Sequence, residues 1–198
     1  MVSILNSLAL RLQELVSEQR YQHVIGVVQT SIALAHRYGV DEQKAETAAW
    51  LHDMYREKSK EQLLPLLREQ DADFLRKPFS TWHGPACANQ MQSIFGIHDA
   101  EIEHAVRYHT IGHPDFTRLG DILYVADAIE PSRNFDKVDI LRHIATIDLT
   151  LAVLAIVKDT MVHLLHRHRE IDANTLALYH RTLQGVSPEL LGHLDALR

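Results

Sequence analysis

The chain has 198 residues, of which 46% are hydrophobic, and carries a formal net charge of −6 at pH 7. This length and apolar content predict one globular domain over residues 1–198 with a substantial buried core. The negative charge disfavours a nucleic-acid partner, and a single cysteine excludes an intramolecular disulfide, which fits a cytoplasmic location.

The first fifty residues predict three helices. Residues 4–15 carry apolar side chains at helical spacing, and Arg11 interrupts them before a signal-peptide core develops. A second apolar stripe ends at Gly39, which is a suitable C-terminal cap. Asp41 is expected to cap the third helix, whose face of small residues leads to His52.

The middle of the chain is less regular. Ser59 and Gln62 have the spacing of a capping box, and Pro65 predicts that the helix they begin is short or kinked. Residues 71–82 are expected to form a loop. A helix is then expected over residues 83–96.

The second half of the chain is strongly helical. Helices are expected after Asp99, from Thr117 to Pro131, over 139–169 in one or two pieces, and over 173–184. No strand alternation is visible, so we predict an all-α helical bundle with about seven to nine helices of typical length. The C-terminal helices, over about 139–185, should pack on a core of about 18–135.

No segment predicts a membrane partner. The longest apolar run, over residues 151–157, is far too short to cross a bilayer. The protein is therefore expected to be soluble.

Six residues follow one another in a suggestive order at spacings of about one helical hairpin. They are His23, the adjacent pair His52 and Asp53, His83, His109 and Asp127. His52 and His109 fall on inward faces of their helices, and a buried Asp127 is costly unless it is paired or bound to metal. A lone histidine on an apolar face is more often a core residue, but the full ordered set favours a metal site inside the bundle.

The pair His52 and Asp53 favours two metal ions rather than one. Neighbours on a helix are turned by about 100°, so the imidazole can face one ion while the carboxylate bridges to a second. Mixed imidazole and carboxylate ligands suit iron, manganese or zinc better than magnesium. A bridged metal pair makes hydroxide at neutral pH and directs it at phosphate, so we predict a dinuclear centre in the core.

Five segments carry a resemblance to a known family. They are residues 20–27 (RYQHVIGV), 48–53 (AAWLHD), 83–85 (HGP), 108–112 (YHTIG) and 124–133 (YVADAIEPSR). The chain resembles the HD-domain metal-dependent phosphohydrolases and, more narrowly, the YqeK-type symmetrical bis(5'-nucleosyl)-tetraphosphatases, the diadenosine tetraphosphate hydrolases. The resemblance spans about residues 15–185, and the HTxG and AD-x-x-EP-x-R segments are its most specific parts.

The resemblance implies the metal ligands and the reaction. His23, His52, Asp53 and Asp127 would hold one divalent ion, and Asp53, His83 and His109 the other, with iron expected and manganese or zinc as alternatives. Diadenosine tetraphosphate would be cut into two ADP molecules by attack of hydroxide on a central phosphorus. The family also suggests a homodimer.

Further residues are expected to act on the substrate. Asp53, Arg56 and Arg133 are the candidate catalytic residues, and Arg56 stands where the family usually has lysine. The expected substrate-binding set is Arg20, His23, Arg56, His83, His109, Thr110, Gly112 and Arg133. For each arginine the plain alternative is a surface ion pair. For Thr110 and Gly112 it is a turn that simply ends a helix, rather than one that presents N–H groups to phosphate.

Two other functions fit the same residues. One is an HD phosphohydrolase that acts on another nucleotide or phosphate ester, with the same metals and a different pocket. The other is a non-catalytic regulatory module on an HD-like fold, although such modules usually lose metal ligands and all six are present here.

Overall fold

The computed structural model describes residues 4–196, and the side-chain surroundings through residue 192. Within this part of the chain all regular structure is helical, which confirms the all-α prediction. The helices are α1 (Ile4–Leu15), α2 (Glu18–Tyr38), α3 (Glu42–His52), α4 (Lys60–Leu63), α5 (His83–Ala88), α6 (Met91–Phe95), α7 (Ala100–Tyr108), α8 (Arg118–Ile129), α9 (Val138–Ile147), α10 (Leu149–His166), α11 (Ala173–Gly185) and α12 (Pro188–Ala196).

The described chain contains more helices than the predicted seven to nine. The helix predicted over residues 83–96 is broken at Asn89 and Gln90 into α5 and α6. The loop predicted over residues 71–82 contains short 3₁₀ turns, and α12 lies beyond the last predicted helix. Short turns of this kind carry too little periodicity to be recognised from sequence.

The main helix ends follow the predicted capping chemistry. The Asp41 side chain accepts hydrogen bonds from the backbone N–H groups of Gln43 and Lys44 at 2.9 and 3.1 Å. Asp99 caps α7 in the same way. Gly39 ends α2 with a φ of 66°, a left-handed conformation that glycine adopts at little cost. These caps fix where α2, α3 and α7 begin and end, and hence where their functional residues lie.

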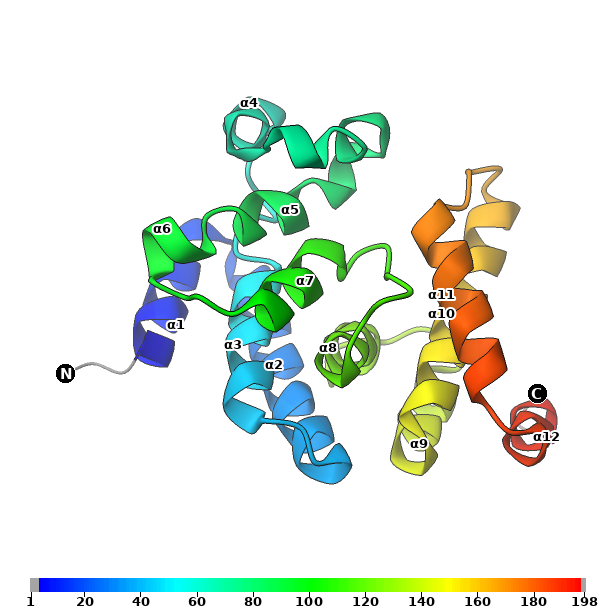
Figure 1. Cartoon of the computed structure of the whole chain (residues 1–198). Coiled ribbons are helices and arrows are strands. Elements are labelled where there is room, and N and C mark those ends of the chain that lie inside the picture. The colour runs from blue at the N-terminus through cyan, green and yellow to red at the C-terminus, as the bar shows by residue number, and fades with distance from the viewer. Residues whose placement is uncertain (1–3, 197–198) are drawn as a thin grey trace.

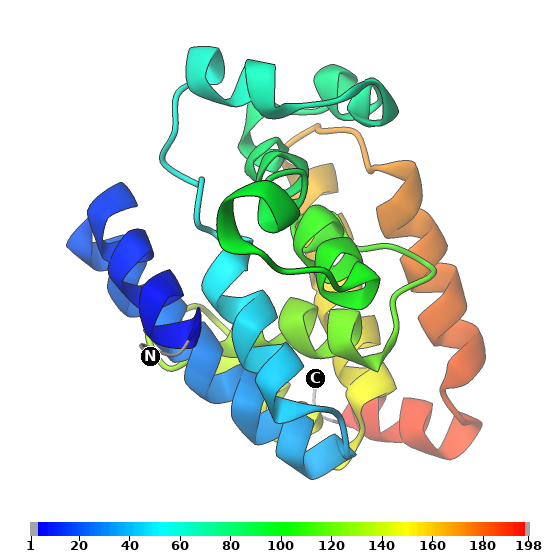
Figure 2. The same ribbon diagram turned by 60° about the vertical axis from the view of Figure 1, so that its left-hand side comes forward.

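The helices pack in two groups that meet at α8. Helices α2, α3, α7 and α8 lie against one another, with α5 on α7 and α1 on α3 (Figure 1). On the other side of α8, α10 packs against α8, α9 and α11, as the turned view also shows (Figure 2). The core is apolar and continuous through both groups, so the faces of α2, α3, α7 and α8 that meet are held at fixed spacing.

Helix α10 is long and apolar enough, by length and composition alone, to cross a membrane. Residues 149–157 of this helix, with the exception of Thr150, are buried in the protein core. The apolar character of α10 is therefore accounted for, over this half, by packing against α8, α9 and α11.

A buried polar network holds the segment between α3 and α5 in place. The guanidinium of Arg107 on α7 pairs with Asp71, which is 1% exposed, and donates to Oδ1 of Asn89 at 2.9 Å. Asn89 donates in turn to Asp71 at 2.6 Å and to the carbonyl of Leu66 at 2.9 Å. A buried charge needs such partners. The network ties this segment to Arg107 of α7 and to Asn89 after α5. Residues of the same segment between 73 and 81 line the cleft over the functional site.

Candidate metal centre

The fold brings the six predicted residues to the place where α2, α3, α5, α7 and α8 meet. His23 lies in α2, His52 is the last residue of α3 and Asp53 follows it. His83 begins α5, His109 ends α7 and Asp127 lies in the last turn of α8. The four imidazoles and Asp53 are buried, from 0% exposed at His52 to 6% at His23.

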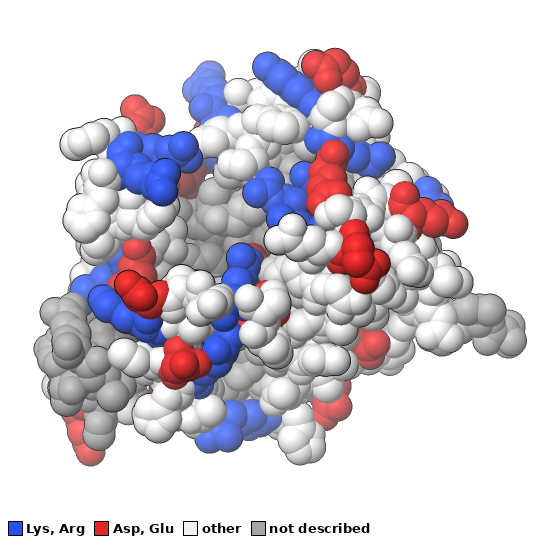
Figure 3. Space-filling view, turned by 180° about the vertical axis from the view of Figure 1, so that it is seen from behind, with Lys and Arg blue, Asp and Glu red and all other residues white. Residues whose placement is uncertain are grey.

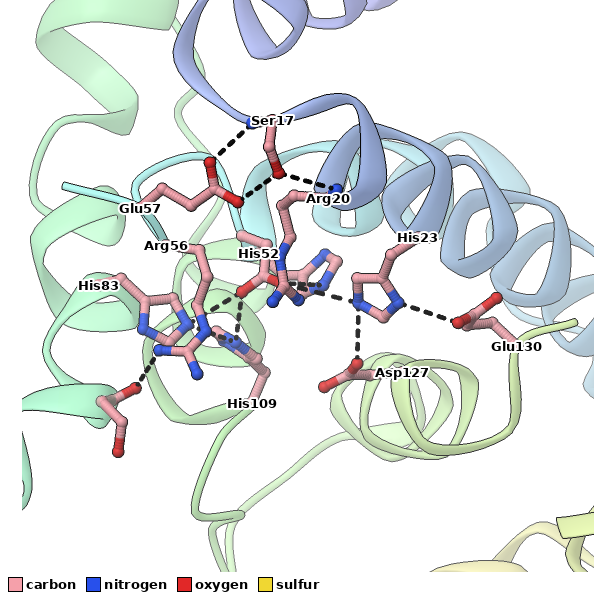
Figure 4. Close-up of polar contacts among 12 residues, drawn as sticks. Ser17, Arg20, His23, His52, Arg56, Glu57, His83, His109, Asp127 and Glu130 are labelled. Carbon is pink, nitrogen blue, oxygen red and sulfur yellow. Dashed lines mark hydrogen bonds and ion pairs between the residues drawn. The ribbon is translucent and has the colours of Figure 1, made fainter. Parts of the chain in front are cut away.

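Asp53 lies at the centre of the group. Its Oδ2 is 3.7 Å from Nε2 of His23 and 3.5 Å from Nε2 of His52. Its Oδ1 is 3.1 Å from Nε2 of His83 and 3.7 Å from Nε2 of His109. The two oxygens of one carboxylate thus face two separate histidine pairs, which is the geometry of a bridging ligand. The imidazoles of these histidines converge on one place (Figure 4).

Three of the imidazoles are oriented by hydrogen bonds on their outer side. Nδ1 of His52 donates to the carbonyl of Ala49 at 2.7 Å, and Nδ1 of His109 donates to the carbonyl of Val106 at 2.8 Å. Nδ1 of His23 donates to the carboxylate of Glu130 at 3.0 Å. Each bond places the ring proton on Nδ1 and leaves the Nε2 lone pair facing Asp53.

These residues fit divalent metal ions. Nε2 of His23 and Nε2 of His52 are buried and have no hydrogen-bond partner among the described residues. An unsatisfied buried acceptor costs free energy, and a cation between the two rings and Asp53 would satisfy both lone pairs. The donor set of imidazoles and carboxylates suits iron, manganese or zinc.

The electrostatics keep the ligands in the form that binds metal. Burial would raise the pKa of Asp53, but the nearby His52, His109 and His83 hold it well below its usual value. Burial lowers the pKa of His52, and it lowers the pKa of His83 to about 4. At neutral pH the centre therefore offers an ionised Asp53 carboxylate and neutral His52 and His83 imidazoles, the forms that bind metal. Burial would lower the pKa of His23, but the carboxylates of Asp127 and Glu130 outweigh this effect and raise it.

Asp127 stands slightly apart from the two compact groups. Its Oδ1 is 3.2 Å from Nε2 of His23, but the same oxygen accepts a hydrogen bond from Nη2 of Arg133 at 2.6 Å. Arg133 also donates from Nε to the Asp127 carbonyl at 2.9 Å. The structure therefore brings Asp127 to His23 while Arg133 neutralises its charge.

A cleft of about 1100 Å³ opens over the centre and is lined by Asp53, His83, His109 and Asp127. Arg20, Arg56, Thr110 and Arg133 also line it. Side chains of both charges, Lys and Arg as well as Asp and Glu, lie around the hollow in Figure 3. The arginines that line the cleft, Arg20, Arg56 and Arg133 among them, can bind an anionic ligand.

The predicted substrate-binding residues differ in their present contacts. Arg20 donates to Oδ2 of Asp53 at 2.8 Å, and Arg56 donates to the carbonyl of Ser80 at 3.0 Å. The hydroxyl of Thr110 is buried without a hydrogen-bond partner among the described residues. Gly112, with a φ of 73°, uses its N–H to bond the carbonyl of Tyr108 at 2.7 Å and does not line the cleft.

Glu130 lies within the AD-x-x-EP-x-R segment but is not among the predicted site residues. Glu130 is 0% exposed and bonds Nδ1 of His23, the ring nitrogen opposite the one that faces Asp53. Arg142 braces the turn by donating to the carbonyls of Ile129, Glu130 and Arg133, each at 2.9 Å. The sequence feature that could have identified Glu130 is its position three residues after Asp127, about one helical turn along the chain.

Comparisons with known proteins agree with this geometry. A family model described as the HD domain matches residues 20–132. The symmetrical bis(5'-nucleosyl)-tetraphosphatase of Bacillus subtilis (strain 168) is 38% identical over 171 residues, which is 85% of this chain and 92% of that protein. The protein of the same name from Halalkalibacterium halodurans is 38% identical over 169 residues, 84% of this chain and 90% of that protein.

A solved structure has the same fold over almost the whole chain. It is that of a predicted HD superfamily hydrolase involved in NAD metabolism from Clostridium acetobutylicum. The TM-score is 0.81 at 27% identity, and the match covers 91% of this chain and 97% of the other.

Proposed function

The chain belongs to the symmetrical bis(5'-nucleosyl)-tetraphosphatases of the HD domain family, and we propose from this premise that it cleaves diadenosine tetraphosphate into two ADP molecules. It is an enzyme, a metal-dependent hydrolase. The observation that carries the proposal is the Asp53 carboxylate, which faces two histidine pairs beneath an arginine-lined cleft.

The proposed ligands divide into two sets that share Asp53. His23, His52, Asp53 and Asp127 would hold one divalent ion, and Asp53, His83 and His109 would hold the other. Iron is the proposed metal, with manganese or zinc as alternatives of the same ligand preference. When bound, such a pair supplies positive charge for the phosphate oxygens and lowers the pKa of a water molecule to near neutrality.

The arginines would act on the phosphates. Arg20 and Arg133 are at present bonded to Asp53 and Asp127. These carboxylates would coordinate the metal ions, and the guanidinium groups would then be free to bind phosphate oxygens. Arg56, whose one hydrogen-bond partner among the described residues is the Ser80 carbonyl, already lines the cleft. Their positive charge is placed where negative charge develops in the transition state.

The other proposed substrate contacts come from Thr110 and from three of the histidines. The free hydroxyl of Thr110 lines the cleft and could donate to a phosphate oxygen. His23, His83 and His109 would contact the substrate through the metals that they hold. Because ADP leaves as a stable anion, the residues need supply no strong acid.

We also propose the wider setting of the enzyme. It would act in the cytoplasm on a small nucleotide, without a nucleic-acid or membrane partner, as one domain with the C-terminal helices packed on the HD core. A homodimer is proposed because α1 leaves Ile4 and Leu10 exposed at 42% and 61%. Light scattering on the purified protein would measure its mass.

The first test is hydrolysis of diadenosine tetraphosphate by anaerobically purified protein, with products separated and metal counted on the same sample. We expect ADP alone and about two metal ions per chain. AMP with ATP would contradict the proposed cleavage. Metal content without turnover would favour the alternative of another nucleotide or phosphate ester, which a nucleotide panel would then identify.

Removal of the bridging carboxylate tests the metal assignment directly. Asp53→Ala should lose both metal ions and all hydrolysis, while Asp136→Ala, at an exposed aspartate, should lose neither. Retention of two metal ions by Asp53→Ala would show that the centre is wrongly assigned.

A further inference from the structure

A second, smaller pocket of about 360 Å³ lies beside the cleft, and the two share Arg20 and Arg133 as lining residues. Asp53, His83, His109 and Asp127 line only the cleft, whereas His23 and Glu130 line only the smaller pocket. The two arginines therefore form the boundary between the cavities. Known small-molecule sites run from about 300 to 1,000 Å³, so the second pocket is large enough for part of a ligand.

We propose that this second pocket holds one of the two nucleosides of the substrate, with Phe135 as the residue on which its base stacks. The inference rests on the proposed function. A dinucleotide cut at its midpoint carries two phosphates and one nucleoside on each side of the broken bond. An enzyme that makes this cut needs room on both sides of its metal centre, and the paired cavities provide it.

The boundary residues lie where the phosphate chain would pass. Arg20 and Arg133 are partly exposed, at 28% and 38% of their side chains. Their guanidinium groups also reach the carboxylates of Asp53 and Asp127. Each can therefore bind a phosphate oxygen between the metal centre and the second pocket.

The other residues of the second pocket suit a neutral nucleoside better than a phosphate. The carboxylate of Glu57 accepts hydrogen bonds from the N–H and hydroxyl of Ser17 at 2.6 and 2.7 Å (Figure 4). Each of its oxygens keeps a lone pair that can accept from a ribose hydroxyl, while its charge repels phosphate. Asn134 adds an amide that can both donate and accept hydrogen bonds with a base.

Phe135 supplies the apolar surface. It is 46% exposed, and of the exposed large apolar side chains in the described part of the chain it alone lines either cavity. An aromatic ring that is open to solvent beside polar groups is well suited to stack on a nucleobase.

The experiment compares Phe135→Ala with the unchanged enzyme on diadenosine tetraphosphate and on adenosine 5'-tetraphosphate, which lacks the second nucleoside. Loss of one base–aromatic stack should raise KM for the dinucleotide roughly tenfold, with kcat little changed. The KM or inhibition constant of adenosine tetraphosphate should stay within about twofold. Removing the second nucleoside and removing Phe135 abolish the same contact, so the two effects should not add. Phe135→Tyr should restore the dinucleotide KM, and Ile147→Ala, at an exposed residue outside both cavities, should change nothing.

Binding of ADP gives a second readout that does not depend on turnover. Calorimetry of the metal-loaded enzyme should find two ADP molecules per chain, and Phe135→Ala should bind one of the two about tenfold more weakly. A single ADP in the unchanged enzyme, an unaltered dinucleotide KM in Phe135→Ala or an equal loss on both substrates would overturn the second nucleoside pocket. Failure of the unchanged enzyme to form ADP would overturn the proposed function instead, and the ADP stoichiometry would still decide the pocket.

Discussion

The carboxylate of Glu130 accepts a hydrogen bond from Nδ1 of His23 at 3.0 Å, and both side chains are buried. The opposite ring nitrogen of His23 lies 3.2 Å from Oδ1 of Asp127. Burial would raise the pKa of Glu130, but hydrogen bonds from Ser132 and His23 lower it, so the carboxylate stays charged. An ionised Glu130 orients the imidazole and makes it a stronger metal ligand.

Glu130→Gln should therefore weaken metal binding while leaving the fold intact. The amide keeps the shape of the side chain but loses the charge that polarises His23. Loss of a carboxylate that holds a ligating histidine costs about 10- to 100-fold in metal affinity, which competition with a chelator would measure. Glu69→Gln, at an exposed residue, is the control. Equal affinities for the two variants would show that Glu130 has no part in the centre.

Gly26 in α2 makes room for Glu130. A Cβ atom at this position would overlap Oε2 of Glu130 and would lie 3.3 Å from Cδ of Pro131. Gly26→Ala should improve helix propensity by about 1 kcal/mol, yet lower metal affinity by displacing the carboxylate. Chelator competition on the single and double variants would measure this, because Gly26→Ala should cost much less in a Glu130→Ala background. Additive losses would contradict the steric explanation.

The parts of the centre that depend on local pattern could be predicted from the sequence. The apolar stripes placed His52 and His109 on inward helix faces, and Asp41 and Asp99 marked the helix starts that set those faces. The part played by Glu130 could not be predicted in this way, because it depends on a contact with His23, more than a hundred residues earlier.

Long-range contacts also explain the errors in the helix boundaries. Asn89 follows the last residue of α5 and bonds Asp71 and Leu66. These two residues lie in a segment for which the sequence predicts a short helix and then a loop. Nothing in the sequence around Asn89 indicates that it has these partners. The division between the cleft and the second pocket is equally a product of packing, since Arg20 and Arg133, far apart in the sequence, line both cavities only in the fold.

Arg56 should tolerate lysine far better than alanine. Its guanidinium donates to the Ser80 carbonyl at the cleft wall and leaves other N–H groups for phosphate. Arg56→Lys keeps the charge with a different geometry, so kcat/KM should fall no more than about tenfold, whereas loss of a transition-state donor in Arg56→Ala should cost about 10²- to 10³-fold. Steady-state kinetics on diadenosine tetraphosphate would measure both.

The matched control for Arg56 is Arg11→Ala, since Arg11 lies outside the cleft, over the ring of Phe95. This variant should leave kcat/KM unchanged. If Arg56→Ala were as active as Arg11→Ala, then Arg56 would serve the loop that contains Ser80 and not the substrate.

The stability of the metal-free protein should fall as the pH drops below about 6.5. Burial lowers the pKa of His83 to about 4, whereas an exposed histidine has a pKa of 6.5. Between these values the unfolded chain binds a proton that the folded chain refuses, so the free energy of unfolding decreases with falling pH. Burial lowers the pKa of His52 too. Burial would also lower the pKa of His23, but the carboxylates of Asp127 and Glu130 beside its two ring nitrogens outweigh this effect and raise it.

Because His23 acts in the opposite sense, the informative measurement is the difference made by one substitution. Urea unfolding of the metal-free protein at pH 7 and at pH 5 measures the decrease in the free energy of unfolding between these two pH values. This decrease should be about 2 kcal/mol smaller in His83→Gln than in the unchanged protein, because a pKa shift of this size contributes that amount. His98→Gln, at an exposed histidine, should leave the loss unchanged. An equal pH dependence in His83→Gln and the unchanged protein would mean that His83 is protonated in the metal-free fold. The neutral form of this ligand would then have to be supplied by metal binding, and metal affinity would fall steeply over the same pH range.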